Sequence, residues 1–363
     1  MSRVAVLGAG SWGTTMAAML AARTSTTLWC RRPVLADQIN RRHRNRDYMV
    51  RLDLPATLRA TGDLEEAVDG ADVVIMATPS HGFRAILSAA SSKLAPGACV
   101  VSLTKGVEQD TLKRMTEVIA EVAPGRPYAV LTGPNLCEEV ALGHPTCSVV
   151  AAVTPRGPER ARQTGGHGPV DELLATELQR LFSTETFRVY TNPDLVGCEL
   201  AGALKNVIAI ASGIVDGMGF GDNTRAALIT RGLAELTRLG VALGGHPLTF
   251  SGLAGMGDLV ATCMSRRSRN RWAGEQLGRG RAIQEIESET RMIAEGVRTS
   301  SAVVELGRQA GVDTPIASEV VAVIYEGKQA TDAVSSLMQR VMKPELHGIS
   351  ISAPAPSNTP AAP

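Results

Sequence analysis

The feature that most constrains this chain is a glycine-rich turn close to its N-terminus. An apolar segment, RVAVL, is followed by GAGSWG at residues 8–13 and then by a helical segment of small side chains. In the G-x-G-x-x-G pattern Gly8 allows a tight turn, Gly10 leaves room for a pyrophosphate, and Gly13 lets the helix approach the strand. The amides at the helix N-terminus and the helix dipole then favour bound phosphate. The flanking strand and helix therefore favour a dinucleotide site over a glycine turn of another kind.

Composition narrows the class of protein. The 363 residues suffice for two domains, and the hydrophobic fraction of 44% is typical of a soluble globular protein. Because 37 basic and 36 acidic residues leave a net charge of +1, no overall field attracts nucleic acid or an acidic membrane surface. Aromatic residues make up only 3%, which argues against base stacking. We expect a small-molecule partner and no nucleic acid.

Cysteine spacing and hydropathy set the expected compartment. The six cysteines show no C-x-x-C pair and no histidine pattern beside them, so we expect neither a metal site nor a disulfide framework. The first strand begins at residue 3, without the segments of a signal peptide. We expect no apolar run to reach the roughly 18 residues that cross a bilayer. These observations predict a cytoplasmic protein without a membrane span.

The first half of the chain alternates strands with helices. Further strands are expected at residues 26–30, 73–77, 99–103, 128–131, 147–151 and 186–190, and helices at 64–68, 83–94, 111–122 and 173–182. This alternation predicts an α/β Rossmann-type, doubly wound and mostly parallel sheet. Such sheets bind ligands beyond the carboxyl ends of their strands. The loops expected to matter are 8–13, 31–33, 78–82, 104–106 and 132–135.

The second half has a different pattern. Residues 154–169 contain Gly, Pro, Arg and His and predict an exposed, mobile insertion. After Asn192 strands end, and helices are expected at 195–215, 224–243, 271–277, 299–310, 316–325 and 331–342. We therefore expect a dinucleotide-binding domain over 1–191 and an all-α C-terminal substrate domain over 192–350. Residues 351–363, rich in Ala, Pro and Ser, predict a disordered tail, and the apolar helices favour a homodimer.

The residues after the second strand bear on the cofactor. An acidic residue about 20 residues beyond the glycines usually binds the ribose hydroxyls of NAD. This chain has Arg31 and Arg32 there. Guanidinium groups suit a 2′-phosphate and can stack on adenine, which favours NADP. Alternatively the two arginines are merely solvated and NAD is accepted as well.

Two lysines lie at positions where packing of a core does not call for a charged side chain. Lys205 interrupts an otherwise apolar helix, and Lys105 follows a strand at the edge where ligands bind. Burial or a neighbouring cation would lower the pKa of Lys205 and allow proton exchange near neutral pH. The alternative is a surface lysine whose ammonium reaches solvent.

Three other segments present polar groups. Asp258 lies in a glycine loop, and Glu295 could accept hydrogen bonds from a cofactor amide or ribose. Ser268, Arg269 and Asn270 precede a helix, so hydroxyl, amide, guanidinium and helix-start N–H groups together suit a phosphate. A plain N-cap beside a basic surface run is the other interpretation of this triplet.

Several motifs resemble one family over roughly residues 1–345. They are GAGSWGTTMA at 8–17, LTKGVE at 103–108, TGPN at 132–135, the block beginning ALKNVIAIASGIVDG at 203, GLAGMGDLVATC at 252–263, SRNR at 268–271 and AEGVRT at 294–299. Together they are similar to bacterial NAD(P)-dependent glycerol-3-phosphate dehydrogenases. The resemblance implies oxidation of glycerol 3-phosphate to dihydroxyacetone phosphate with formation of NAD(P)H. It also implies that the reverse reaction supplies glycerol 3-phosphate for phospholipid synthesis.

The resemblance also implies roles for individual residues. Lys205 would be the catalytic proton donor and acceptor, and Lys105 would contact both substrate and cofactor. The other substrate-binding positions would be Gly133, Asn135, Asp258, Ser268, Arg269 and Asn270. The cofactor would contact Gly8, Gly10, Ser11, Trp12, Gly13, Arg31, Arg32, Cys137, Arg269, Ile293 and Glu295. The chain departs from the family at Asn135, usually Ser or Thr, and at Cys137, usually Ala.

Two other functions are compatible with parts of this sequence. A related β-hydroxyacid or ketoacid dehydrogenase would share the Rossmann domain, the helical domain and a lysine, but would recognise carboxylates rather than phosphates. A regulatory protein that binds a cofactor without turnover would have no need for the lysine pair, the aspartate and the Ser-Arg-Asn triplet together. The sequence therefore favours the phosphate-specific dehydrogenase.

Overall fold

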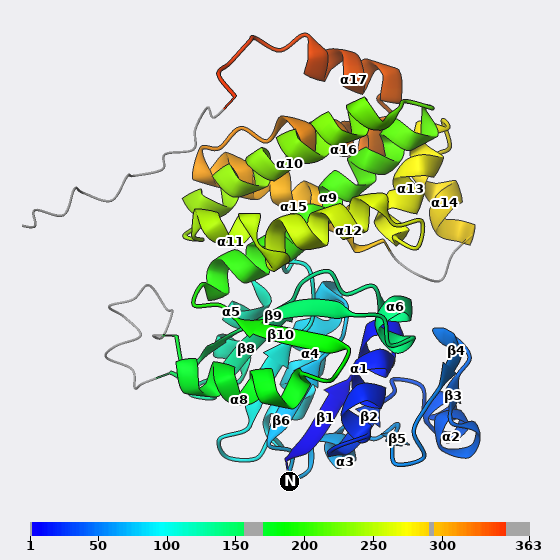
Figure 1. Ribbon diagram of the computed structural model, residues 1–363, viewed down its shortest axis with the longest axis vertical. Helices are drawn as coiled ribbons and strands as arrows, with labels where there is room; N and C mark the ends of the chain where they lie inside the picture. Colours follow the sequence, from blue (N-terminus) through cyan, green and yellow to red (C-terminus); the bar gives the residue numbers. More distant parts are fainter. Residues whose placement is uncertain (1, 156–169, 290–293, 346–363) are drawn as a thin grey trace, which may run out of the picture.

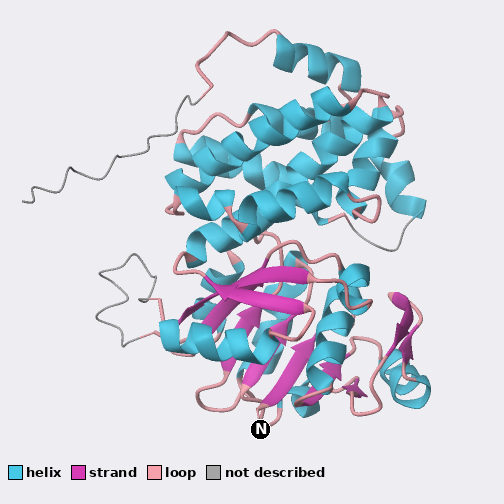
Figure 2. Cartoon of the chain, viewed as in Figure 1, coloured by secondary structure: helices cyan, strands magenta, loops and turns pink. Residues whose placement is uncertain are grey.

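The computed structural model describes residues 2–155, 170–289 and 294–345. The strands of the large sheet lie in one half of the molecule, and the helices from α9 onward form the other half (Figures 1 and 2). In the described part of the chain no strand follows residue 191. The predicted combination of an α/β sheet region and an all-α C-terminal region is confirmed.

The sheet has eight strands in the order β10-β9-β8-β7-β6-β1-β2-β5. Their bounds are β1 Arg3–Leu7, β2 Ser25–Trp29, β5 Arg59–Thr61, β6 Val73–Met76, β7 Cys99–Ser102, β8 Tyr128–Thr132, β9 Thr146–Val153 and β10 Phe187–Thr191. In the centre of the sheet Val6 pairs with Leu28 of β2 and with Ile75 of β6. All neighbouring strands are parallel except β8 and β9, which are antiparallel. The prediction of a mostly parallel, doubly wound sheet is confirmed.

Helices cover both faces of this sheet. The alternation of side chains along β1 sends Val4 and Val6 to one face and Ala5 and Leu7 to the other. The first face packs against α1 Ser11–Ala21, α2 Pro33–Arg42 and α8 Glu172–Phe182. The second packs against α3 Leu64–Val68, α4 Ser80–Ser91 and α5 Met115–Val122, and its core continues into the helical half. A single apolar core therefore crosses the junction between the halves.

The helical half is arranged around α9, Leu195–Gly217, which contacts α10, α12, α13 and α15. The remaining elements are α10 Asp222–Ala242, α11 Pro247–Ser251, a π-helical turn Leu253–Gly257, α12 Asp258–Met264, α13 Arg269–Gly278, α14 Ile283–Glu289, α15 Glu295–Ala310, α16 Pro315–Tyr325 and α17 Ala330–Met338. With its 23 residues and mean hydropathy of 1.5, α9 is long and apolar enough to cross a membrane. The expectation that no run is long enough was therefore wrong. The apolar window of α9 is 100% buried, which is how a core helix behaves.

Glycines bring α9 and α13 into backbone contact. A Cβ atom on Gly213 would lie 1.9 Å from the carbonyl oxygen of Arg271, and one on Gly274 would lie 2.0 Å from that of Ile210. No larger residue fits at either position without separating the helices. This close approach places the first turn of α13 beside the middle of α9.

A small hairpin was not predicted. Its strands are β3 Arg44–Asn45 and β4 Met49–Asp53, paired antiparallel. The side chain of Asn45 is fully buried and its Nδ2 donates to the Ala9 carbonyl at 2.9 Å and to Thr14 Oγ1 at 2.8 Å. The hairpin thus depends on contacts with the glycine turn and α1 rather than on its own sequence pattern.

One other expected element begins at a different residue, and two expected segments lie mostly or wholly outside the described residues. Helix α5 begins at Met115 instead of residue 111, because Leu112 has a φ of 59° and Val107 forms a β-bridge with Arg114. Of the predicted insertion only residues 154 and 155 are described, and the predicted tail at 351–363 lies outside the described residues.

Candidate active site

The glycine turn joins β1 to α1 as the sequence suggested. Gly8 has a φ of +119°, and a Cβ atom there would lie 2.6 Å from the carbonyl oxygen of Ala77. A Cβ on Gly13 would lie 1.9 Å from the carbonyl oxygen of Gly8, whereas one on Gly10 would have no atom within 4 Å. The turn is therefore tight against β6 and α1 but open in front of Gly10, at the N-terminus of α1.

The open turn fits a dinucleotide. Thr78 follows β6 and lies beside Gly8. Its Oγ1 is buried and has no hydrogen-bond partner in the described structure, and the same is true of the Trp12 Nε1 atom. Ser11, the first residue of α1, donates its hydroxyl to the Tyr48 carbonyl at 3.2 Å. Buried polar atoms are almost always paired, so unpaired ones beside an open glycine turn indicate a place for a ligand.

The two lysines meet at one carboxylate. Lys205 Nζ in α9 donates to Asp258 Oδ1 at 2.9 Å, and Lys105 Nζ, just after β7, donates to Asp258 Oδ2 at 2.7 Å. Lys105 also donates to the Gly133 carbonyl, after β8, at 2.8 Å. Lys205 is only 4% exposed and Asp258 2%, so the surface-lysine alternative for Lys205 does not hold. The loops after β7 and β8 thus join α9 and α12 at one point.

The setting of Asp258 differs from the glycine loop that was expected. Residues 253–257 form a π-helical turn that continues directly into α12, and Asp258 is the first residue of that helix. Such turns are rare and occur often at functional sites. A Cβ atom on Gly255 would lie 2.1 Å from the carbonyl oxygen of Phe250, which explains why glycine is needed for the tight winding.

Sequence reasoning missed Thr262. Its Oγ1 accepts a hydrogen bond from Lys205 Nζ at 2.5 Å and donates to the Asp258 carbonyl at 2.6 Å. A threonine four residues after the aspartate lies on the same face of α12, so the spacing was a readable signal once Asp258 was singled out.

Burial and charge act against each other in this cluster. Burial lowers the pKa of Lys205 to about 8, and Lys105 adds to the lowering while Asp258 opposes it. For Asp258 burial by itself raises the pKa, but Lys105 and Lys205 outweigh it, and the pKa is lowered overall. The cluster therefore holds a stable carboxylate and a lysine able to exchange a proton near neutral pH.

Asn206, beside Lys205 in α9, connects three elements. Its Nδ2 donates to the Lys105 carbonyl at 3.3 Å, and its Oδ1 accepts from Asn270 Nδ2 at 2.9 Å. Oδ1 of Asn270 accepts in turn from the Gly296 backbone N–H at 3.0 Å. The Asn270 side chain thus links α9, α13 and α15, and this leaves its backbone N–H in the first turn of α13 as the group suited to an anion.

The start of α13 has the predicted N-cap. Ser268 Oγ accepts from the Arg271 backbone N–H at 3.2 Å and so caps the helix, while the hydroxyl hydrogen is able to donate to an anion. Arg269 is the first residue of the helix, and its charge acts on both Cys137 and Glu295. The triplet therefore faces the same region as these two predicted cofactor residues.

Glu295 and Cys137 are each the first residue of a helix, and the charges of Arg269 and Lys105 act on both. Burial raises the pKa of Glu295, the first residue of α15, to about 7, although Arg269 and the two lysines oppose the shift. Burial likewise raises the pKa of Cys137, the first residue of α6 Cys137–Ala141, against Arg269 and Lys105. The Cys137 carbonyl accepts from Thr15 Oγ1 of α1 at 3.4 Å. Ile293 lies outside the described residues.

Asn135 lies between β8 and α6. Its Nδ2 donates to Ser148 Oγ at 3.2 Å, while its buried Oδ1 has no partner in the described part of the chain. The buried Oγ1 of Thr132, at the end of β8, is equally unpaired. Both atoms stand at the carboxyl end of β8, where ligands of such sheets bind.

Arg31 and Arg32 are exposed after β2, away from the lysine cluster along the sheet edge. Arg32 is the N-cap residue of α2 and forms an ion pair with Asp47 of the β3–β4 hairpin. Within the described ranges no group of three His, Cys, Asp or Glu residues could hold a metal ion.

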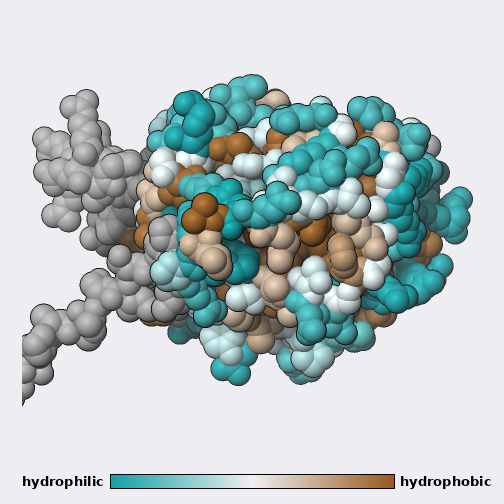
Figure 3. Space-filling model, turned by 90° about the horizontal axis from the view of Figure 1, so that it is seen from above, coloured by the Kyte–Doolittle hydropathy of each residue, from teal (hydrophilic) through white to brown (hydrophobic). Residues whose placement is uncertain are grey.

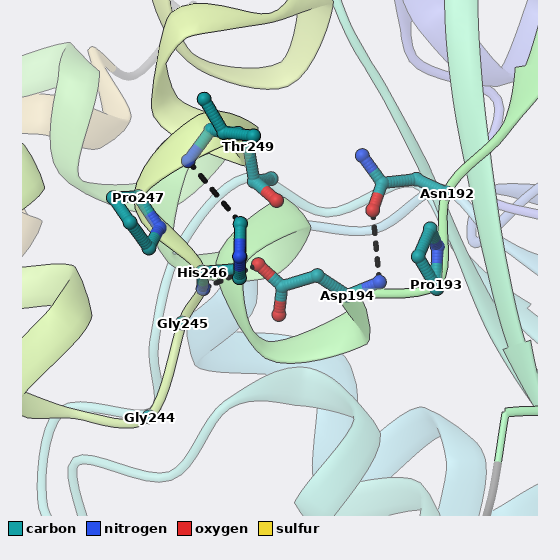
Figure 4. Close-up of a pocket in the computed structure, with 9 residues that line it drawn as sticks. Asn192, Pro193, Asp194, Gly244, Gly245, His246, Pro247 and Thr249 are labelled. Atoms are coloured by element: carbon teal, nitrogen blue, oxygen red, sulfur yellow. Dashed lines mark hydrogen bonds between the residues drawn. The ribbon is translucent and has the colours of Figure 1, made fainter. Parts of the chain in front are cut away.

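A separate pocket of about 620 Å³ contains none of the predicted site residues (Figure 4). It lies where the connection from β10 to α9 meets the turn between α10 and α11. Asp194 Oδ1 caps α9 by accepting from Gly197 N at 2.8 Å, and Oδ2 accepts from His246 N at 2.7 Å. Its carboxylate is thus already occupied by the chain.

Comparison with known proteins identifies the family. The N-terminal model of NAD-dependent glycerol-3-phosphate dehydrogenase matches residues 3–157, and the C-terminal model matches residues 194–335. A glycerol-3-phosphate dehydrogenase [NAD(P)+] of Streptomyces coelicolor is 50% identical over 346 residues, covering 94% of this chain and 98% of the relative. One from Sphingopyxis alaskensis is 48% identical over 345 residues, covering 95% and 98%.

Solved structures agree with this result. The crystal structure of glycerol-3-phosphate dehydrogenase from Coxiella burnetii has a TM-score of 0.86 and 33% identity, covering 93% of this chain and 99% of that one. A ketopantoate reductase from Ralstonia eutropha, with a TM-score of 0.55 and 17% identity, shares the fold alone. The resemblance inferred from the motifs is confirmed: the chain belongs to the NAD(P)-dependent glycerol-3-phosphate dehydrogenase family.

Proposed function

We propose that this protein interconverts glycerol 3-phosphate and dihydroxyacetone phosphate with NAD or NADP, and that Lys205 carries the proton. It is an NAD(P)-dependent oxidoreductase, and the family role is to supply glycerol 3-phosphate for phospholipid synthesis. The observation that carries the proposal is the buried contact of Lys205 and Lys105 with Asp258 at the carboxyl edge of the sheet. This is the edge at which the glycine turn also opens.

Lys205 acts as acid in one direction and base in the other. The nicotinamide, when bound, supplies or accepts the hydride at the carbon that is ketone or alcohol. Protonated Lys205 donates a proton from Nζ to the developing alkoxide, and neutral Lys205 removes it in the reverse direction. Asp258 and Thr262 hold Nζ in place, and Lys105 adds positive charge beside the oxygen. Positioned proton transfer of this kind contributes about 10²–10⁴-fold to the rate.

The phosphate of the substrate is bound by the first turn of α13. Arg269 supplies charge, and Ser268 and Asn270 supply a hydroxyl and a backbone N–H. Gly133 and Asn135 complete the substrate site from the end of β8. The phosphate does not react, but its binding energy orients the carbonyl toward the nicotinamide.

The dinucleotide lies along the sheet edge. Gly8, Gly10 and Gly13 shape the pyrophosphate site, and Ser11 and Trp12 begin the helix whose N-terminus faces it. Arg31 and Arg32 bind the adenosine end. Cys137, Ile293 and Glu295, with Lys105 and Arg269, are the remaining residues proposed to contact the cofactor. The open space at Gly10 and the unpaired Oγ1 of Thr78 support this assignment.

The organisation proposed for the chain follows from the same architecture. Residues 1–191 form the dinucleotide-binding domain, 192–350 the helical substrate domain and 351–363 a tail. We also propose a cytoplasmic homodimer. Tyr325, Met338 and Val341 are exposed apolar side chains of the helical half. Figure 3, which views the molecule from above, shows brown hydrophobic surface among teal on this side. Sedimentation equilibrium tests the dimer.

Initial rates test the reaction itself. The purified protein is assayed with dihydroxyacetone phosphate in the presence of NADH and of NADPH, and in parallel with 2-keto and 3-keto acids. We expect oxidation of the reduced cofactor only with the triose phosphate. Turnover of the carboxylates instead would establish the related dehydrogenase class, and no turnover with any substrate would establish a binding protein.

A further inference from the structure

We infer that Asp47, in the β3–β4 hairpin, sets the preference between NADP and NAD by competing with the 2′-phosphate for Arg32. The inference deepens the proposed function, because it concerns the adenosine end of the same cofactor site. Asp47 then has the role of the acidic residue that is absent at the end of β2.

The hairpin is held firmly against the glycine turn. Asn45 donates from its buried Nδ2 to the Ala9 carbonyl at 2.9 Å and accepts at Oδ1 from the Asp47 backbone N–H at 3.3 Å. The Tyr48 carbonyl accepts from Ser11 Oγ at 3.2 Å. These bonds connect the residues on both sides of Asp47 to the glycine turn and to the first residue of α1. The backbone at Asp47 is thus held by the same elements that form the pyrophosphate site.

The carboxylate is in contact with only one of the two arginines. Asp47 Oδ2 forms an ion pair with Arg32 Nη2, and in the described chain no ion pair joins Arg31 to a carboxylate. Arg32 directly precedes α2, three residues after the end of β2, where such folds bind the adenosine ribose. One guanidinium is therefore available to a 2′-phosphate, while the other is neutralised.

The two cofactors meet this arrangement differently. A 2′-phosphate must displace Asp47 from Arg32 and is repelled by the displaced carboxylate. A ribose 2′-hydroxyl carries no charge and can donate a hydrogen bond to a carboxylate, as it does in NAD sites with an acidic residue. Asp47 thus weakens NADP binding and supports NAD binding, which explains how a site with two arginines can serve both cofactors.

The test compares Asp47→Asn with Asp53→Asn. Asp53 lies in the same hairpin and pairs with Arg44 at 2.6 Å, so it provides the same change of charge without contact to Arg32. Titration calorimetry with ADP-ribose and with 2′-phospho-ADP-ribose at fixed ionic strength measures affinity without turnover. We expect Asp47→Asn to raise the affinity ratio of the phosphorylated to the plain probe about tenfold, and Asp53→Asn to change it less than about twofold.

A double-mutant cycle with Arg32→Gln sharpens the result. If Asp47 acts through Arg32, its replacement in the Arg32→Gln background has a clearly smaller effect. An unchanged ratio in Asp47→Asn, an equal change in Asp53→Asn or an undiminished effect without Arg32 would overturn the inference. Because the probes require no catalysis, a shifted ratio in a protein that does not reduce dihydroxyacetone phosphate would reject the proposed function alone.

Discussion

Arg114 and Glu199 join the two halves of the molecule through a buried ion pair. Arg114 Nη1 in the sheet half lies 2.7 Å from Glu199 Oε2 in α9, and Glu199 Oε1 accepts from the Thr116 backbone N–H at 2.9 Å. Burial raises the pKa of Glu199, against the lowering effects of Arg114 and Thr116. Since α9 also carries Lys205, the pair helps to place the lysine against residues of the sheet half.

Replacing Glu199 by Gln should therefore affect both stability and catalysis. Removing the buried carboxylate leaves the Arg114 guanidinium facing the more exposed Glu117, and the loss of a buried pair costs up to about 3–5 kcal/mol in the free energy of unfolding. We expect a lower Tm and, in the protein that remains folded, a lower kcat. Glu117→Gln is the control, because Glu117 pairs with Arg114 from a more exposed position and should cost about 1 kcal/mol. Denaturant unfolding compares the free energies of unfolding of the two variants. Equal losses of stability in both would show that the buried pair has no special role.

Lys205→Ala should abolish proton transfer and leave the cofactor site intact. We expect kcat to fall by about 10²–10⁴-fold with little change in cofactor affinity. The control is Lys343→Ala, because Lys343 is exposed near Asp313 in the helical half. Steady-state kinetics and cofactor titration separate the two effects. A variant that loses cofactor binding but keeps kcat contradicts the assignment.

The pH dependence should follow the ammonium of Lys205. Its pKa, lowered by burial to about 8, means that ketone reduction, which needs the protonated lysine, falls as the pH rises through about 8. Alcohol oxidation, which needs the neutral amine, rises over the same range. Because the charge of Asp258 raises this pKa, Asp258→Asn should move both transitions to lower pH. Profiles of kcat in both directions test this, and a shift to higher pH would exclude Lys205 as the titrating group.

Arg269→Ala should weaken binding of the triose phosphate. A charge-assisted hydrogen bond contributes about 1.5–3 kcal/mol, which corresponds to a rise in KM of about 10- to 100-fold. Arg267→Ala is a matched control two residues away, where the arginine is partly exposed and faces Glu138 and Glu139. If both variants keep the KM of the original protein, the phosphate binds elsewhere.

Ionisation of Glu235 should lower the free energy of unfolding as the pH rises. Burial raises its pKa to about 7, although its carboxylate accepts from the Ile316 and Ala317 backbone N–H groups. A raised pKa in the folded state gives stability that is present below the ordinary value of about 4.5 and lost as the pH rises through about 7. Glu235→Gln, which cannot ionise, should reduce the decline in Tm between pH 5 and 8. An unchanged slope would mean that other groups cause it.

Local patterns were sufficient for much of the fold. The glycine turn, the short apolar strands and the helical periodicity after residue 195 specify elements whose physical causes lie within a few residues of each other. Lys205 and Asp258 were recognisable for a related reason, because a charge inside an apolar helix and a carboxylate after glycines are out of place in a core. Asn45 and its hairpin were not recognisable, because their bonds are made to α1 and the glycine turn.

The sequence by itself determined the class of fold, the dinucleotide turn and the family, since each of these depends on residue types at short spacing. Only the tertiary structure decided the chemistry of the lysine. Lys205 lies 53 residues from Asp258, and Lys105 lies 153 residues from it, yet all three touch in a buried cluster. The pKa of an amine depends on the solvent and charges within a few ångströms, and folding alone determines which groups these are.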